Sequence, residues 1–345
     1  MKRLLLTGAA GFFGHHVLEY VLNNTDWQVV CLVRLNTVGD LNRIAEIAEI
    51  KKHGDRARFV YHDLKFSLNN DVAQKIGKVD YVLHLAANTH VDRSIINPKE
   101  FFEDNVIGTV NLLEWLRHYN PEARLVNFGT DEVFGPAPDD YKFKEDDRYR
   151  PSNPYSASKA GQICAGMSYH MTYGLDIISA YTMNIFGERQ CPEKFVPACI
   201  KNFIAGKQQA IHAKLRKGLD ETQNKKDVLE VGQRHWLYAG NAADALLFIL
   251  KKGKAGEHYN IVGDTELQND ELALMIAGIL KKEHKLKKNP ELIYVDFHKT
   301  RPGHDRRYAL DGSKIAAMGW KPKLSFEDSL KKTVDWTVKN KQVGC

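Results

Sequence analysis

Thr7-Gly8-Ala9-Ala10-Gly11-Phe12-Phe13-Gly14 is the stretch that determines how this chain folds. An apolar run at residues 4–7 precedes the glycines and predicts a buried first strand, and a helical pattern follows them. Glycines at such a junction allow a tight turn and a close approach of the backbone to a pyrophosphate, which the N-terminus of a helix attracts. The stretch therefore predicts a dinucleotide site that includes Gly8, Gly11, Phe12, Phe13 and Gly14.

The rest of the first half alternates apolar runs, at residues 29–33, 58–61, 81–85, 124–128 and 176–181, with longer amphipathic stretches. This alternation predicts an α/β fold, a Rossmann-type doubly wound parallel sheet. Beyond residue 184 the alternation ends, which predicts a smaller C-terminal α/β substrate lobe. We expect the dinucleotide-binding domain at 1–183, with 233–260 returning to it, and the substrate lobe mainly at 184–232 and 261–345. The charged stretch 214–230 predicts an exposed loop or an insertion.

Composition narrows the class of protein. The 345 residues are 43% hydrophobic and 27% charged, as in ordinary globular proteins. No apolar run approaches the ~20 residues of a membrane helix, so we expect a cytoplasmic protein without a membrane partner. The net charge of +6 comes from scattered Lys and Arg, which favours an anionic small ligand over nucleic acid. Five cysteines without a CxxC pair predict reduced thiols and no metal site.

The end of the second predicted strand bears on the choice of cofactor. An NAD enzyme usually has an acid there to bind the ribose hydroxyls, but here Val33 is followed by Arg34. An arginine can bind a 2′-phosphate, so the expected cofactor is NADP or NAD, with NADP favoured. Arg34 could instead be a surface charge that stacks on the adenine. Asp63 could accept a hydrogen bond from the adenine amino group, or could be an ordinary turn residue.

Tyr155 and Lys159 are four residues apart in a predicted helix, which places them on one helical face. An ammonium group beside a tyrosine hydroxyl stabilises the phenolate and lowers the pKa of the tyrosine. Such a tyrosine can accept the proton of an alcohol while hydride leaves the carbon for a nicotinamide. The YxxxK pattern is frequent by chance, but its occurrence in the same Rossmann-type unit as the glycine stretch favours a catalytic pair.

Asp131 and Glu132 follow the predicted strand at 124–128. Ligands of such sheets bind outside the carboxyl ends of the strands. Two carboxyl groups there can act as acid and base if their surroundings separate their pKa values. The alternative is that Asp131 caps the turn and Glu132 faces water.

Taken together, these motifs resemble the extended short-chain dehydrogenases that act on sugar nucleotides, and within them the 4,6-dehydratases. The resemblance runs nearly end to end. It is carried by the glycine stretch, His84-Leu85-Ala86-Ala87, His90-Val91-Asp92-Arg93-Ser94, Asn105-Val106-Ile107-Gly108-Thr109, Thr130-Asp131-Glu132-Val133-Phe134-Gly135, Tyr155 with Lys159, Pro192-Glu193-Lys194-Phe195-Val196-Pro197 and Arg301-Pro302-Gly303-His304-Asp305-Arg306-Arg307-Tyr308.

The resemblance implies the conversion of a dTDP- or UDP-hexose to its 4-keto-6-deoxy form with a recycled cofactor. Tyr155, with Lys159 and Thr130, would remove the O4 proton as C4 gives up hydride. Glu132 would then take the C5 proton, Asp131 would protonate the departing C6 hydroxyl, and hydride would return to C6. The further cofactor contacts that it implies are Leu64, Leu85, Ala86 and Ala87.

The implied substrate contacts are His90, Ser94, Thr130, Asn184, Glu193, Lys194, Asn202, Arg234, Asn269, Arg301 and His304, with Arg234 and Arg301 on the diphosphate. The resemblance also implies a homodimer through a four-helix bundle formed by the predicted helices at 101–118 and 156–173. Three departures concern specificity: Val33 in place of an acid, the length of 214–230, and His235 where the family often has an acid.

Two other hypotheses remain open. An epimerase or a decarboxylase of the same superfamily would share Tyr155 and Lys159 but would need no acid at C6, so Asp131 discriminates between these reactions. A catalytically idle NADP-sensing or scaffold protein would not require Tyr155, Lys159, Asp131 and Glu132 all to be present.

Overall fold

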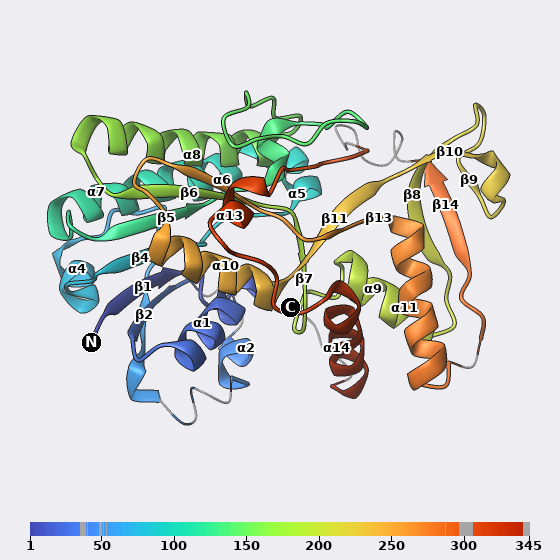
Figure 1. The fold of residues 1–345 in the computed structure, drawn as a ribbon, viewed down its shortest axis with the longest axis horizontal. Coiled ribbons are helices and arrows are strands. Elements are labelled where there is room, and N and C mark those ends of the chain that lie inside the picture. Colours follow the sequence, from blue (N-terminus) through green and yellow to red (C-terminus); the bar gives the residue numbers. More distant parts are fainter. Residues whose placement is uncertain are drawn as a thin grey trace.

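A computed structural model describes residues 1–34, 39, 41–47, 50, 52, 54–286, 288–296 and 306–340. In these residues the largest sheet, here the main sheet, has seven parallel strands in the order β12-β6-β5-β4-β1-β2-β3. This order confirms the Rossmann-type fold predicted from the sequence (Figure 1). The strands are β1 (Arg3–Thr7), β2 (Gln28–Val33), β3 (Ala57–Tyr61), β4 (Tyr81–His84), β5 (Arg124–Phe128), β6 (Ile177–Thr182) and β12 (His258–Ile261).

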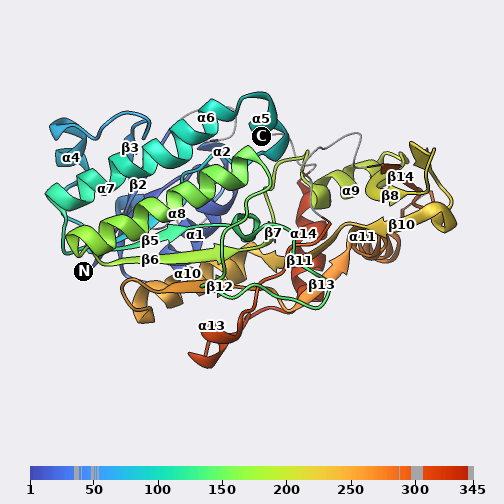
Figure 2. The same ribbon diagram turned by 90° about the horizontal axis from the view of Figure 1, so that it is seen from above.

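Helices cover both faces of the main sheet because its strands are apolar on both sides. Leu4 and Leu6 pack toward α1 (Phe12–Asn24) and α10 (Ala239–Lys252), whereas Leu5 packs toward α4 (Asn70–Ile76) and α7 (Gly108–Tyr119). The long helix α8 (Pro154–Tyr173) lies beside α7 (Figures 1 and 2). Shorter helical segments are α2 (Leu41–Ala45), α5 (Val91–Ile96), α6 (Pro98–Phe102), a π-helix (Glu103–Ile107), α13 (Ser313–Ala317) and the 3-10 helices Gly54–Arg56, Asp131–Phe134 and Lys225–Asp227.

A second core lies beside the carboxyl ends of the main-sheet strands (Figure 1). One of its sheets has the order β10-β8-β14-β9 and the other β13-β11-β7, with three helices packed on them. The elements are β7 (Asn184–Phe186), α9 (Phe195–Ile204), β8 (Gln209–Leu215), β9 (Glu221–Thr222), β10 (Val228–Val231), β11 (Gln233–Tyr238), β13 (Thr265–Gln268), α11 (Asn269–Glu283), β14 (Leu292–Asp296) and α14 (Phe326–Lys339).

The charged stretch 214–230 differs from the predicted loop. It forms β9, a 3-10 helix and most of β10, which are edge elements of the smaller lobe. The apolar side chain of Val231 enters the second core, and Lys214 forms an ion pair of 2.9 Å with Glu230 across the β8–β10 pair. Opposite charges on neighbouring strands stabilise such a pairing, so a charged stretch can still be a sheet edge.

Residues 233–260 divide between the two sheet systems. β11 pairs with β7 and β13, whereas α10 covers the main sheet and β12 pairs with β6. The predicted domain boundaries themselves stay a prediction.

No helix in the described part of the chain is both long enough and apolar enough to cross a membrane. Cys31, Cys164 and Cys199 are free thiols, but Cys191 is disulfide-bonded, which corrects the expectation of reduced cysteines for that residue.

Candidate active site

The turn between β1 and α1 needs glycine at two positions. Gly8 has a φ of 73°, and a Cβ atom there would lie 2.8 Å from the backbone nitrogen of Ala86. A Cβ atom on Gly14 would lie 2.0 Å from the carbonyl oxygen of Gly8. The first turn of α1 therefore packs directly on the β1–α1 turn and leaves backbone N–H groups open to a ligand.

A pocket lies at this turn and brings most of the predicted cofactor residues together. It is lined by Gly8, Gly11, Arg34, Asp63, Leu64, Leu85, Ala86 and Ala87, with Lys65 and Asp104 among its other residues. Phe12, Phe13 and Gly14 lie beside it in the first turn of α1, where the Phe13 ring stacks on Phe128 at 5.0 Å. A dinucleotide fits this site because glycine keeps its floor open and a helix N-terminus faces it.

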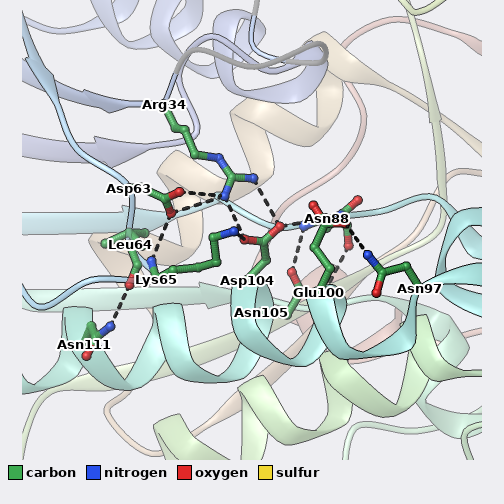
Figure 3. Close-up of polar contacts among 10 residues, drawn as sticks. All are labelled: Arg34, Asp63, Leu64, Lys65, Asn88, Asn97, Glu100, Asp104, Asn105 and Asn111. Atoms are coloured by element: carbon green, nitrogen blue, oxygen red, sulfur yellow. Dashed lines mark hydrogen bonds and ion pairs between the residues drawn. The ribbon is translucent and has the colours of Figure 1, made fainter.

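Arg34 is engaged by acids within this pocket (Figure 3). Its guanidinium donates to both carboxylate oxygens of Asp104, at 2.7 and 3.1 Å, and to Asp63 at 3.2 Å. Val33 beside it is buried. The sequence did not reveal these partners, because Asp104 lies on a helix 70 positions away in the chain.

A buried hydrogen-bond chain connects β1, β4 and α7. Thr7 Oγ1 accepts from the backbone N–H groups of Leu85 and Ala86, so its own proton goes to His84 Nδ1, at 2.8 Å. His84 Nε2 then donates to Thr109 Oγ1, also at 2.8 Å. Burial lowers the pKa of His84 to about 3, so the ring is neutral. A histidine inside an apolar strand was the signal for this network, which fixes the backbone of the pocket.

Asp131 and Glu132 form the first turn of the 3-10 helix after β5. The Thr130 hydroxyl donates to Asp131 Oδ1 at 2.9 Å and also caps the turn. Burial, and then the charge of Glu132, raise the pKa of Asp131 to about 7. Glu132 Oε2 accepts from the side-chain amide of Asn153 at 3.4 Å and from the Tyr308 hydroxyl at 3.5 Å. The two carboxyl groups thus lie in different surroundings, as an acid–base pair requires.

Tyr155 and Lys159 both lie buried on α8, next to this turn. A hydrogen bond with Thr130 favours the phenolate, but burial and the charge of Glu132 raise the pKa of Tyr155 well above its usual range. Lys159 donates to the carbonyl of Phe128 and to Gln162, at 2.6 Å each, and burial lowers its pKa to about 7. The predicted lowering of the Tyr155 pKa by Lys159 is therefore not observed, since burial dominates.

Arg234 reaches the same site from β11. It is buried, its guanidinium lies 4.8 Å from the centre of the Tyr308 ring, and its charge favours the ionised form of Asp131. It also donates to the carbonyls of Gln233 and Arg306. Arg301 and His304 lie outside the described residues. The sequence predicts no role of its own for Tyr308, which ends the motif that begins at Arg301, although its contact with Glu132 places it at the site.

The other predicted substrate residues lie on several elements, and their surroundings differ. Burial, and then the charge of Lys194, lower the pKa of His90, and the charge of Glu193 opposes this lowering. The Ser94 hydroxyl is engaged within the protein, since it accepts from the backbone N–H of Tyr155 at 3.1 Å and donates to Val91. The remaining three differ in environment: Asn184 opens β7, Asn202 donates to Gln209 at 2.9 Å, and Asn269 begins α11 with a buried Oδ1 that no hydrogen bond reaches in the described structure.

A glycine turn, a Tyr–Lys pair on one helix and adjacent carboxyls at the carboxyl edge of a Rossmann sheet define an extended short-chain dehydrogenase. The chain belongs to the GDP-mannose 4,6 dehydratase family, whose model matches residues 5–333.

Curated relatives cover nearly the whole chain. A dTDP-glucose 4,6-dehydratase of Escherichia coli is 36% identical, over 98% of this chain and 93% of its own length. One from Haemophilus influenzae is 34% identical, over 99% of both chains.

Solved structures agree with this. The dTDP-glucose 4,6-dehydratase of Streptomyces venezuelae, determined with NAD bound, is 32% identical over 98% of both chains, with a TM-score of 0.83. A UDP-glucose 4-epimerase from Thermus thermophilus, also with NAD, is 27% identical over 98% of this chain and 99% of its own, with a TM-score of 0.81. NAD in these structures does not support the preference for NADP that the sequence suggested.

Proposed function

We propose that this protein removes water from a dTDP-linked glucose to form the 4-keto-6-deoxy sugar. The observation that carries the proposal is the Thr130-Asp131-Glu132 turn beside Tyr155, in which burial and Glu132 raise the pKa of Asp131 to about 7. An elimination needs one group that still holds its proton and one that does not, and the two carboxyls can fill these roles. The 4-epimerase reaction keeps the C6 hydroxyl, so it does not need an acid such as Asp131 to protonate that group.

The steps follow from the positions of these side chains. Tyr155, as the phenolate that its hydrogen bond with Thr130 favours, accepts the O4 proton while C4 is oxidised, which makes the proton at C5 acidic. Glu132 takes the C5 proton, and Asp131 protonates the C6 hydroxyl as it leaves as water. A dinucleotide held at the turn between β1 and α1 would supply the hydride acceptor for C4 and the hydride donor for C6, so it would not be consumed. Glu132 returns a proton to C5 as C6 receives the hydride, which completes the 4-keto-6-deoxy sugar.

The proposed cofactor is NAD, and dTDP is the proposed nucleotide. The curated and structural relatives named above support both choices. The ion pairs of Arg34 with Asp104 and Asp63 also favour NAD, because an arginine already engaged by two carboxylates is a poor partner for a 2′-phosphate. Arg234, beside Asp131 and Tyr308, is the proposed contact of the substrate diphosphate.

The proposed assembly is a homodimer in which the outer faces of α7 and α8, with the preceding π-helix, pair with those of a second copy. Ile107, Met167, Met171 and Tyr173 are exposed on these helices. Large apolar side chains exposed on neighbouring helices favour a two-fold contact. A cytoplasmic location is part of the same proposal, and cell fractionation tests it.

The activity is tested with a panel of nucleotide-hexoses, including dTDP-, UDP- and GDP-linked sugars. We expect a product lighter by ~18 mass units, the loss of one water, with dTDP-glucose as the best substrate. The absorbance of reduced cofactor should not accumulate, since hydride returns to the sugar. Stoichiometric reduction of the cofactor, or an epimer of unchanged mass, would contradict the proposal.

A further inference from the structure

Four charged side chains lie together in the cofactor pocket: Arg34, Lys65, Asp63 and Asp104 (Figure 3). They are called the Arg34 cluster here. Arg34 donates to Asp104 with two separate nitrogens and to Asp63 with one, and Lys65 Nζ lies 4.0 Å from Asp104. Two positive charges thus face two negative ones, so the cluster as a whole is neutral.

Asp104 is the best-held member of the cluster. Its side chain is 5% exposed, compared with 26% for Asp63 and 30% for Arg34. Asn88 donates to its second oxygen at 3.4 Å. The next residue, Asn105, is bonded to both the N–H and the carbonyl of Asn88 and to Ser158 on α8. The carboxylate is therefore held by Asn88 directly, and its helical turn is held by the bonds of Asn105 to Asn88 and Ser158.

That helical turn has an unusual backbone. Asp104 lies in the π-helix Glu103–Ile107, between α6 and α7. Such turns are rare and occur frequently at functional sites, where they shift side chains out of the regular helical positions. Here the turn brings Asp104 to the pocket and Asn105 to the loop after β4 and to α8.

The end of β2 does not offer the usual acid for a ribose diol. Val33 is buried and apolar, and Arg34 alone would attract a 2′-phosphate. An arginine fork bound at both prongs by a carboxylate has few donors left and no net charge to offer. The carboxylates around it would instead repel a phosphate dianion, at short range and in a partly dry pocket.

We propose that Asp104 is the cofactor-specificity residue of this enzyme: by binding the Arg34 fork, it excludes the 2′-phosphate of NADP and leaves the pocket to NAD. The proposal rests on the proposed function only in requiring a bound nicotinamide dinucleotide. A protein that exchanges NAD but forms no dehydrated sugar would overturn the function and leave this inference intact.

The test uses the purified protein in exchange with a mixture of NAD⁺ and NADP⁺ in equal excess. After removal of free nucleotide, the protein is denatured and the released dinucleotides are counted by mass spectrometry. In Asp104→Asn we expect the captured ratio of NADP to NAD to rise by about tenfold or more, a change equivalent to about 1.4 kcal/mol. Glu103→Gln is the matched control, because Glu103 is the next acid in the same turn and pairs with Lys99 instead.

Two further variants separate the proposal from a general loosening of the pocket. Arg34→Ala should keep NAD and capture even less NADP, and Asp104→Asn combined with Arg34→Ala should lose the gain of NADP. Arg34→Ala alone tests the proposal if Asp104→Asn does not fold. An unchanged ratio in Asp104→Asn, an equal shift in Glu103→Gln, or a loss of NAD capture in Arg34→Ala would overturn it.

Discussion

Asp131 and Glu132 are adjacent in the chain, yet the protein treats them differently. Asp131 is buried beside Thr130, whereas Glu132 accepts hydrogen bonds from Asn153 and Tyr308. Burial, and then the charge of Glu132, raise the pKa of Asp131 to about 7. At the residue scale, then, the chemistry depends on the different surroundings of two adjacent carboxyls, and it can be tested one side chain at a time.

Replacing each carboxyl should stop the reaction at a different step. Asp131→Asn keeps the size of the side chain but cannot deliver a proton, so water loss should slow by roughly 10²–10⁴-fold while C5 exchange continues. Glu132→Gln should abolish C5 exchange itself. Deuterium incorporation at C5 in heavy water, measured with product mass, separates the two. Water loss by Asp131→Asn at the wild-type rate would remove the acid from the mechanism.

The rate should also depend on pH through Asp131. Its pKa is raised to about 7, and the proposed acid is active only when protonated. The rate of the elimination step should therefore fall as the pH rises above about 7, on the side where the proton is lost. A single-turnover profile of water loss between pH 6 and 9 measures this, and Asp131→Asn should lack the falling limb. If the rate still falls above about pH 7 in Asp131→Asn, another titrating group causes the fall.

The free energy of unfolding should also depend on pH through Asp131. A carboxyl whose pKa is higher in the folded state binds more protons folded than unfolded between its ordinary value of 3.8 and about 7. The free energy of unfolding therefore decreases as pH rises through that window. The replaced side chain in Asp131→Asn cannot ionise. The free energy of unfolding should therefore fall less between pH 4 and pH 8 in this variant than in the wild type. Urea unfolding at both pH values tests this, and an equal pH dependence would refute the raised pKa.

At the scale of elements, periodicity predicted most of the main sheet, and the strands start or end within a residue or two of the predicted runs. The sequence could predict β1 and β2 because both are short apolar runs followed by turn signals. It did not predict β9, β10 or the π-helix, and for β9 the reason is that the strand pairs with β14, which is distant in the chain. The Asp104–Arg34 ion pair also joins distant residues, and the local sequence around either residue does not predict the other as its partner.

The N-terminus of α8 offers a test of how an element places a catalytic group. Asn153 caps the helix through a capping box with Ser156, two residues before Tyr155. Asn153→Ala should lower the free energy of unfolding by about 1 kcal/mol. It should also lower kcat on the order of tenfold, because a misplaced group can cost up to ~100-fold. Urea unfolding and steady-state kinetics measure both effects.

Ser325→Ala is the matched control, since Ser325 caps α14 through the N–H of Asp328. It should cost similar stability without the loss of kcat. Asn153→Ser keeps a capping oxygen but loses the amide on Glu132, so it separates the cap from that contact. Equal kcat values in Asn153→Ala and Ser325→Ala would show that the cap only stabilises.

At the scale of the whole molecule, the proposed dimer makes a specific demand on α8. Met167 and Met171 are exposed, one helical turn apart, and should be buried in the partner contact. Changing both to Glu should convert the protein to monomers, as measured by light scattering at micromolar concentration. Leu274→Glu is the control, because Leu274 is also exposed, but on α11 at the far end of the smaller lobe. A monomeric wild type would contradict the proposal.

The site as a whole was less predictable than the sheet. Gly8, Arg34 and Asp63 could be assigned to one pocket because each lies within two residues after the end of a strand of one parallel sheet. The contact of Tyr308 with Glu132 could not, because it joins segments that meet only when the smaller lobe folds against the main sheet. The chemistry of this enzyme is therefore shared between local motifs and the way the two lobes meet.

The position of β12 has a consequence for how the chain is made. This edge strand completes the main sheet by pairing with β6, whose residues are all buried. A ribosome releases β6 well before β12, because β7, α9, β8 and β11 are synthesised in between. During that interval an apolar strand edge has no partner, and it can recruit the same edge of another nascent chain. Chaperone demand during synthesis should therefore be greatest while residues 183–257 are emerging.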